Sequence, residues 1–216
     1  MSLFTVVQFP NEECTDATSS STQGTCYTAS ECTSRGGTAS GGCAAGFGVC
    51  CIISTSTCSS TISTNSTYIR NTNYPSAFTP TSATTCAFTI EKEKDDVCQL
   101  RLDFQTFSGL TVATGGVCTD TFVVEGQTGN NPPTICGTNT GYHSKITISV
   151  LRPPLTLLLS VYAEFGTTST DNVKLTFSFN DLSAKSFNIL TRQISCTSPW
   201  KWVGQGEERV YSVIFL

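Results

Sequence analysis

The sequence contains few charged residues, little positive charge and no long apolar run. Only 13% of its 216 residues are charged, and the formal net charge is −4. We therefore expect no nucleic-acid partner and no binding to anionic lipid, because both need clustered Lys and Arg. No apolar run reaches the roughly 18 residues of a transmembrane helix, so we also expect no membrane span.

Histidine is nearly absent, and this argues against catalysis. His143 is the only histidine, whereas a serine triad needs a histidine base beside its nucleophile. No serine lies in a G-x-S-x-G turn. No C-x-x-C pair offers the spacing of a zinc site. The sequence therefore predicts a protein that is not an enzyme, with no catalytic residues and no zinc.

Cysteine, by contrast, is abundant. The chain has 12 cysteines, an even number, and is rich in serine and threonine. This composition is typical of oxidising compartments, where disulfides persist, and predicts a secreted, extracellular protein. The start, MSLFTVVQFP, lacks the basic residues, the long apolar stretch and the cleavage site of a signal peptide. We expect either that a signal peptide is missing upstream or that the sequence begins late.

The first part of the chain concentrates half of these cysteines. Residues 1–51 have almost no aliphatic side chains after Val7, so they lack the material for an apolar core and must rely on disulfides. Adjacent cysteines cannot comfortably bond to each other, so Cys50 and Cys51 each need a distant partner. Spacing alone leaves the pairing open. The six cysteines are Cys14, Cys26, Cys32, Cys43, Cys50 and Cys51.

The order EEC…QGTCYTASEC…GGCAAGFGVCC resembles a clip domain, a small disulfide knot found in arthropod extracellular proteins. The resemblance implies that the Cys50-Cys51 doublet clamps two upstream segments to one short strand, Phe47–Ile53. The disulfides that it implies are Cys14–Cys50, Cys26–Cys43 and Cys32–Cys51.

Residues 58–196 are dominated by strand patterns. Segments that alternate, or that are rich in β-branched and aromatic residues, recur between Gly, Pro, Asn and Thr turns, and they favour a sandwich or barrel. The charged run Glu91–Asp96 is predicted to be a solvated hairpin turn. The sequon at Asn65, next to a Ser/Thr-rich connector, predicts glycosylation there. The predicted strands are Cys86–Ile90, Cys98–Phe104, Asp120–Val124, Asn172–Phe179 and Ser186–Ile194.

The same region carries an ordered set of landmarks: Cys58, Tyr74-Pro75, Cys86 with Phe88, LRLDFQTF, Cys118 with Asp120, and Cys136-Gly137. This order resembles a CUB domain, an extracellular β-sandwich of jelly-roll type. The resemblance implies the disulfides Cys58–Cys86 and Cys118–Cys136. Two cysteines remain. Either Cys98 and Cys196 bridge each other, or Cys196 opens a second module of fuller relatives and is unpaired here.

The resemblance also implies a calcium site, because many CUB domains hold the ion through one Glu and two Asp residues. Asp120 and Asp181 stand at two of the three positions. The third acid is missing, since Ala113 occupies its place. Calcium takes roughly six to eight oxygen ligands, so the predicted site is incomplete. The alternative is that Asp120 caps a turn and Asp181 is a solvated loop residue.

We predict an all-β fold, a CUB-type antiparallel jelly-roll β-sandwich preceded by a small disulfide-rich clip-like module. The predicted domains are the clip-like module at 1–53, the CUB-like sandwich at 54–196, in which 144–161 looks inserted, and an atypical tail at 197–216. The insertion and the tail are either artefacts of a gene model that retains intron sequence or a genuine loop and tail.

The function predicted from these features is that of a secreted, non-catalytic binding protein. It would recognise an extracellular protein or a glycan through its CUB-like domain, as a member of a group of secreted arthropod CUB-domain proteins would. One alternative is a catalytically inactive clip-type regulator or docking partner in an extracellular protease cascade. Another is a structural component of cuticle or matrix. The sequence leaves the ligand and the oligomeric state open.

Overall fold

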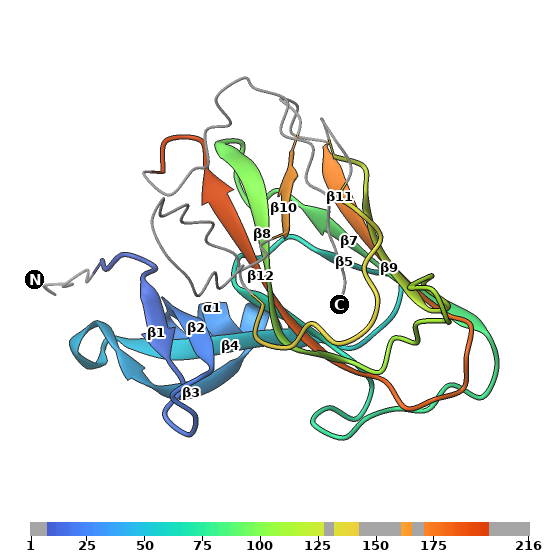
Figure 1. The fold of residues 1–216 in the computed structure, drawn as a ribbon. Helices are drawn as coiled ribbons and strands as arrows, with labels where there is room; N and C mark the ends of the chain where they lie inside the picture. Colours follow the sequence, from blue (N-terminus) through green and yellow to red (C-terminus); the bar gives the residue numbers. More distant parts are fainter. Residues whose placement is uncertain (1–7, 128–131, 143–160, 166–170, 199–216) are drawn as a thin grey trace, which may run out of the picture.

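The computed structural model describes residues 8–127, 132–142, 161–165 and 171–198. These residues form two β-sheets and a small disulfide-rich region at one side (Figure 1). The fold class is the one that the sequence predicts, an all-β sandwich preceded by a disulfide-rich module. The segments 144–160 and 199–216, which hold most of the predicted insertion and tail, lie outside the described residues.

The larger sheet runs through both parts of the molecule. Its strands, in spatial order, are β1 (Glu13–Thr15), β2 (Gln23–Tyr27), β4 (Gly48–Thr55), β6 (Thr67–Arg70), β12 (Ser186–Ser195), β8 (Val97–Ser108) and β10 (Val161–Glu164), and β3 (Thr38–Cys43) also pairs with β4. The smaller sheet has the order β5 (Ser60–Ile62), β7 (Thr84–Glu91), β11 (Asn172–Phe179) and β9 (Thr121–Glu125). All pairs are antiparallel except β4–β6 and β5–β7.

From β4 to β12, successive strands belong to opposite sheets. The connection after β7 therefore crosses from the smaller sheet to the larger one, because β7 pairs with β5 and β11, whereas β8 pairs with β10 and β12. The prediction that Glu91–Asp96 forms a hairpin turn is wrong for this reason. Glu91 ends β7, and the residues that follow it form a turn between the sheets.

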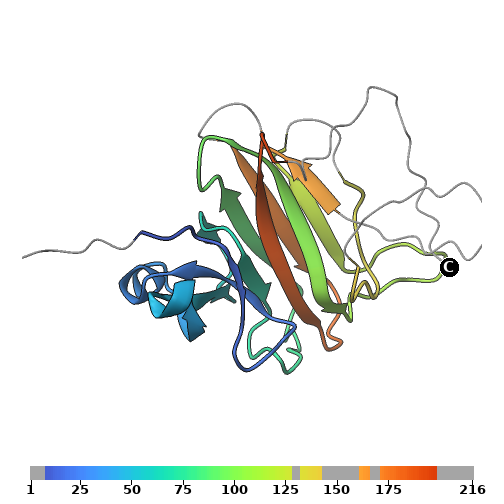
Figure 2. The same cartoon turned by 90° about the vertical axis from the view of Figure 1, so that its left-hand side faces the viewer.

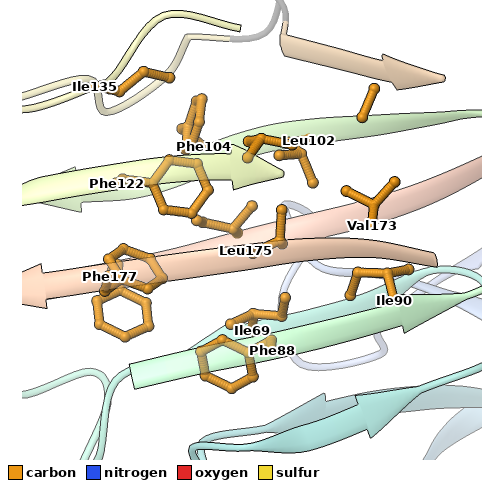
Figure 3. Close-up of a cluster of buried hydrophobic side chains, with 14 of the residues drawn as sticks. Ile69, Phe88, Ile90, Leu102, Phe104, Phe122, Ile135, Val173, Leu175 and Phe177 are labelled. Carbon is orange, nitrogen blue, oxygen red and sulfur yellow. The ribbon is translucent and has the colours of Figure 1, made fainter. Parts of the chain in front are cut away.

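The core lies between the two sheets and is built from their inward-facing side chains. Leu100, Leu102 and Phe104 of β8 are each at most 2% exposed. Figure 3 shows Leu102 and Phe104 beside side chains of β7, β9 and β11. Phe177 lies at the centre of a group of rings, with centroid distances of 4.3 Å to Phe187 and 4.7 Å to Phe122. Burial of this aromatic and aliphatic surface is the main stabilising term for the sandwich.

The described part of the disulfide-rich region, residues 8–53, is called the front module here. Its apolar cluster is small and consists of Tyr27, Cys32, Cys51 and Ile53, with Val49 packed against them. The short helix α1 (Ala29–Ser34) begins at Thr28, whose hydroxyl accepts a hydrogen bond from the Glu31 backbone amide. A single-turn helix, η1 (Ala44–Gly46), joins β3 to β4. Disulfides substitute for the missing core, as the composition predicts.

The front module is joined to the sandwich by a shared strand. β4 pairs with β2 and β3 in the front module, and its last residues, Ile53–Thr55, pair with β6 of the sandwich. The predicted domain boundary at 53/54 thus falls inside β4, and the domain division itself remains a prediction. Figure 2 shows the front module in blue beside the sheet that contains β12 and β8.

Candidate functional site

Asp120 and Asp181, the predicted calcium ligands, lie together in the structure, and a lysine lies between them. The Lys185 Nζ is 2.7 Å from Asp120 Oδ2 and 2.6 Å from Asp181 Oδ1. It also donates to the Ser183 hydroxyl at 2.7 Å. The side chains of Lys185 and Asp120 are both 0% exposed. An ammonium group has three N–H donors, and each of the three has an acceptor here.

The Asp120 carboxylate is fully engaged by its surroundings. Besides the lysine, it accepts hydrogen bonds from the backbone amides of Thr111, Asn180 and Asp181. Burial acts to raise the pKa of Asp120, but Lys185 and these three amides together outweigh burial and lower it. The pKa of Asp181 is lowered chiefly by its hydrogen bond to Lys185. Both carboxylates are therefore ionised at neutral pH.

This arrangement does not fit a calcium ion. The ion would compete with the Lys185 ammonium for the same carboxylate oxygens, and Asp120 has no unused acceptor to offer it. Ala113, at the position of the missing third acid, is exposed. Within the described ranges, no three His, Cys, Asp or Glu residues gather in a way that could hold a metal.

Sequence reasoning missed Lys185, although it lies four residues after Asp181 in DLSAK. Its main chain forms an antiparallel bridge with Phe78, and its side chain contacts Asp120 directly before β9. Gly109 allows this close approach, because it has a φ of +82° and a Cβ there would collide with the Ala184 carbonyl oxygen. The signal that could have identified Lys185 was its isolated positive charge directly before the predicted strand Ser186–Ile194.

The structure contains six disulfides and leaves no cysteine free. They include the three pairs that the clip resemblance implies and the two that the CUB resemblance implies. The sixth, Cys98–Cys196, joins the beginning of β8 to the residue after β12, which is one of the two alternatives that the sequence leaves open. The pairs are Cys14–Cys50, Cys26–Cys43, Cys32–Cys51, Cys58–Cys86, Cys98–Cys196 and Cys118–Cys136.

Asn65 is half-buried and holds the end of β12. Its Oδ1 accepts a hydrogen bond from the Gln193 backbone amide at 2.8 Å, and its Nδ2 donates to the Gln193 carbonyl at 3.3 Å. Glycosylation at Asn65 stays a prediction. His143 lies outside the described residues.

The side of β6, β12 and β8 that faces away from the core is called the outer face. Here the front module docks onto Tyr68, which is 0% exposed. The Tyr68 hydroxyl accepts a hydrogen bond from the Gln23 amide at 2.8 Å and donates to the Gln23 carbonyl at 3.0 Å. Arg192 also contacts the side chains of Gln23 and Glu13. These contacts attach the front module to the sandwich sheet beside the shared strand.

Ion pairs extend across the outer face. Asp103 has a side-chain exposure of only 11% and pairs with Arg101 at 2.7 Å and with Arg192 at 3.1 Å. A further pair at the module junction joins Arg35 of the front module to Glu93 at 2.9 Å. The guanidinium of Arg35 also stacks over the Tyr27 ring at 4.5 Å. One residue of the charged run after β7 therefore helps to hold the front module.

No family model matches this chain, and no curated protein matches it either. Among solved structures it is similar to the full extracellular region of zebrafish Gpr126/Adgrg6, at 20% identity and a TM-score of 0.43 over 64% of this chain and 15% of that one. It is also similar to the CUB1-EGF-CUB2 domain of human MASP-1/3, at 16% identity and a TM-score of 0.43 over 67% of this chain and 44% of that one.

The MASP-1 CUB2 domain bound to Ca²⁺ is a third similar structure, at 14% identity and a TM-score of 0.41, covering 63% of this chain and 99% of that one. The chain thus spans less than half the length of the first two structures. The described residues contain no helix of a length and apolarity that could cross a membrane.

Proposed function

We propose that this chain is a secreted, non-catalytic binding protein that recognises another extracellular protein or a glycan. The observation that carries the proposal is the outer face, where polar side chains are held on paired strands next to a docked second module. Binding residues placed on such a rigid scaffold lose little conformational entropy when they meet a ligand. Complete pairing of twelve cysteines supports an oxidising, extracellular location.

The three disulfides of the front module support its interpretation as a clip-like domain, and the strand order with its cysteines supports a CUB-like sandwich. We propose that the front module serves to orient the outer face. Its contacts through Tyr68 and Arg35 reach the sandwich from two places, so it does not swing freely about one linker.

The test is a binding screen with the intact chain, secreted and with its disulfides formed. It would be immobilised and exposed to a glycan array and to purified extracellular proteins. We expect saturable binding to at least one member, with no turnover of hydrolase substrates. Recovery only with insoluble matrix would favour a structural component, and a protease as the partner would favour the cascade regulator. Absence of any saturable ligand, or catalytic turnover, would overturn the proposal.

A further inference from the structure

A cavity of about 500 Å³ opens on the outer face. It lies between a loop of the front module and the sandwich. One wall is a front-module loop that contributes Ser19, Ser21 and Thr22, whose hydroxyls are hydrogen-bonded to one another. The other wall consists of side chains from the sandwich, among them Arg70 at the end of β6 and Asn188 of β12. This volume lies in the range of small-molecule sites.

A β-bulge shapes the floor of this cavity. Asn188 lies opposite Arg70 on one side and opposite Thr106 on the other, and the register with β8 then shifts so that Ile189 faces Phe104. Gln105 is the extra residue. It and Thr106 both line the cavity, while Phe104 and Phe107 on either side of them enter the core. A bulge re-aims side chains in this way, so two adjacent polar groups face the same space.

Arg70 is held in place without being neutralised. Its guanidinium carbon lies 4.8 Å from the centre of the Tyr68 ring and 5.2 Å from that of Tyr74. Its Nε donates to Asn188 Oδ1 at 3.0 Å. Asn188 is itself fixed, because its Nδ2 donates to Gln105 Oε1 at 3.0 Å. Stacking and hydrogen bonding therefore orient the guanidinium group.

The other two arginines of the outer face differ from Arg70. Arg101 and Arg192 both pair with Asp103, and Arg192 also pairs with Glu13. Arg70 forms no ion pair with any described carboxylate, and its two terminal amino groups have no hydrogen-bond partner among the described residues. No Asp or Glu lines the cavity. The cavity thus offers a fork of N–H donors, the geometry that suits a carboxylate.

The remaining groups around the fork are uncharged and can both donate and accept. The hydroxyls of Tyr74 and Thr106 lie 3.3 Å apart at the sandwich wall, and Ser19, Ser21 and Thr22 of the front-module loop line the same cavity. Hydroxyl and amide groups of this kind match the hydroxyls of a sugar ring, and the single cation matches an acid on that ring.

We propose that this cavity binds a carboxylate-bearing monosaccharide, such as the terminal acidic sugar of a glycan, with its carboxylate on Arg70 and its hydroxyls on the surrounding groups. The proposal rests on the binding function above and names its ligand class. A uronic acid and a sialic acid share this chemistry, and the probes below distinguish them.

The experiment titrates the intact, isotope-labelled protein with methyl glucuronide and with methyl N-acetylneuraminide while its NMR spectrum is recorded. Methyl glucoside tests the need for the acid, and sodium acetate tests the need for the sugar. We expect at least one acidic sugar to shift the signals of residues 19–22, 70 and 188. Arg70→Met should weaken this binding by about tenfold or more, because it removes a charge-assisted pair. Arg70→Lys should weaken it less, since the charge remains but the fork is lost.

Two further variants make the result specific. Lys174→Gln removes a positive charge from an exposed position on β11 in the other sheet and should leave binding unchanged. Thr106→Glu places a carboxylate at the cavity wall and should block the acidic sugar while Arg70 stays. This variant keeps the test valid if Arg70→Met fails to fold.

Equal binding of acetate, or equal binding of the neutral glucoside, would overturn the assignment of an acidic sugar. Binding that survives both Arg70→Met and Thr106→Glu would overturn the cavity as its site. The wild type could also bind no sugar but bind an extracellular protein saturably. That result would overturn this inference and would still support the proposed function.

Discussion

The front module and the sandwich are stabilised by different means. Among the described residues, the sandwich has a core of 23 buried apolar side chains rich in phenylalanine, whereas the front module has a cluster of four. Three disulfides connect the strands and helix of the front module, and the doublet Cys50-Cys51 ties one strand, β4, to two segments upstream. The comparison shows how one chain combines apolar burial with covalent restraint and joins the two regions through a single strand.

The largest expected effect comes from emptying the centre of the sandwich core. Phe177 is 0% exposed and is ringed by other phenylalanines. Phe177→Ala should lower the free energy of unfolding by about 3–5 kcal/mol, since it removes apolar contacts and leaves a cavity. Urea denaturation followed by circular dichroism measures this loss.

The matched control is Phe47→Ala in the front module, where the side chain is 61% exposed. It should change the unfolding free energy by about 0.5 kcal/mol or less. Equal losses for the two variants would contradict the contrast between the two regions.

The next largest effect tests Lys185, the one fully buried cation among the described residues of the sandwich. Lys185→Met should cost about 3 kcal/mol at neutral pH, because it leaves the buried Asp120 charge unpaired. The pKa of Asp120 in the folded wild type lies below its usual 3.8, so this stabilisation is present above about pH 4 and is lost as the pH falls through the folded pKa. The variant lacks the hydrogen bond from Lys185, which is the largest of the interactions that lower the pKa of Asp120. The effect of burial then prevails, and the pKa rises.

Thermal unfolding at pH 7 and pH 3 measures this difference. The loss caused by Lys185→Met should be smaller at pH 3, where Asp120 can take up a proton. The double variant Asp120→Asn with Lys185→Met should recover part of the stability, which a double-mutant cycle would quantify. Millimolar calcium should leave the wild-type midpoint unchanged. A pH-independent loss, or a midpoint raised by calcium, would refute the account of this cluster.

Removal of one disulfide from each region sharpens the comparison further. Cys32–Cys51 and Cys118–Cys136 close loops of nearly equal length, with sequence separations of 19 and 18. Each double alanine variant should therefore cost about 2–3 kcal/mol by chain entropy. Hydrogen exchange should nevertheless show α1 and β3 losing protection in the first variant, while β7 and β11 keep theirs in the second. Similar local behaviour in both variants would contradict the division into covalent and apolar stabilisation.

The smallest effect concerns the docking of the two regions. Tyr68→Phe removes two hydrogen bonds to Gln23 but keeps the buried ring. It should cost about 1–2 kcal/mol, since the Gln23 amide loses its partner. Hydrogen exchange of residues 23–27 should speed up relative to that of β11. An unchanged exchange rate would show that the shared strand alone fixes the front module.

Much of the sandwich could be predicted because its strands alternate clearly. The spacing of Val173, Leu175, Phe177 and Phe179 is enough to define β11 and its inward face, and all four are buried. Alternation identifies a strand but not its partner. The wrong prediction of a hairpin at residues 91–96 came from assuming that consecutive strands pair, whereas here they lie in opposite sheets. The bulge at Gln105 also had no sequence signal that alternation could detect.

The polar sites were harder to predict because they depend on residues brought together from distant segments. Asp120 and Asp181 were found through a family pattern, but the lysine between them was not, since ion pairs across loops leave no periodic trace. Arg70 was overlooked for a similar reason. Its setting needs Asn188 of the last strand, which is 118 residues away in the sequence, and a loop of the front module.

The parallel pairing of β4 with β6 has a mechanical consequence. Tension applied between the amino-terminal region and the sandwich would run along β4. It would load the hydrogen bonds between β4 and β6 together, in shear, so that they would not break one after another. Beyond β4, the Cys58–Cys86 bridge transfers the pull to the opposite sheet. A chain built in this way can carry a stretching force through its module junction while the wall of the adjacent cavity keeps its shape.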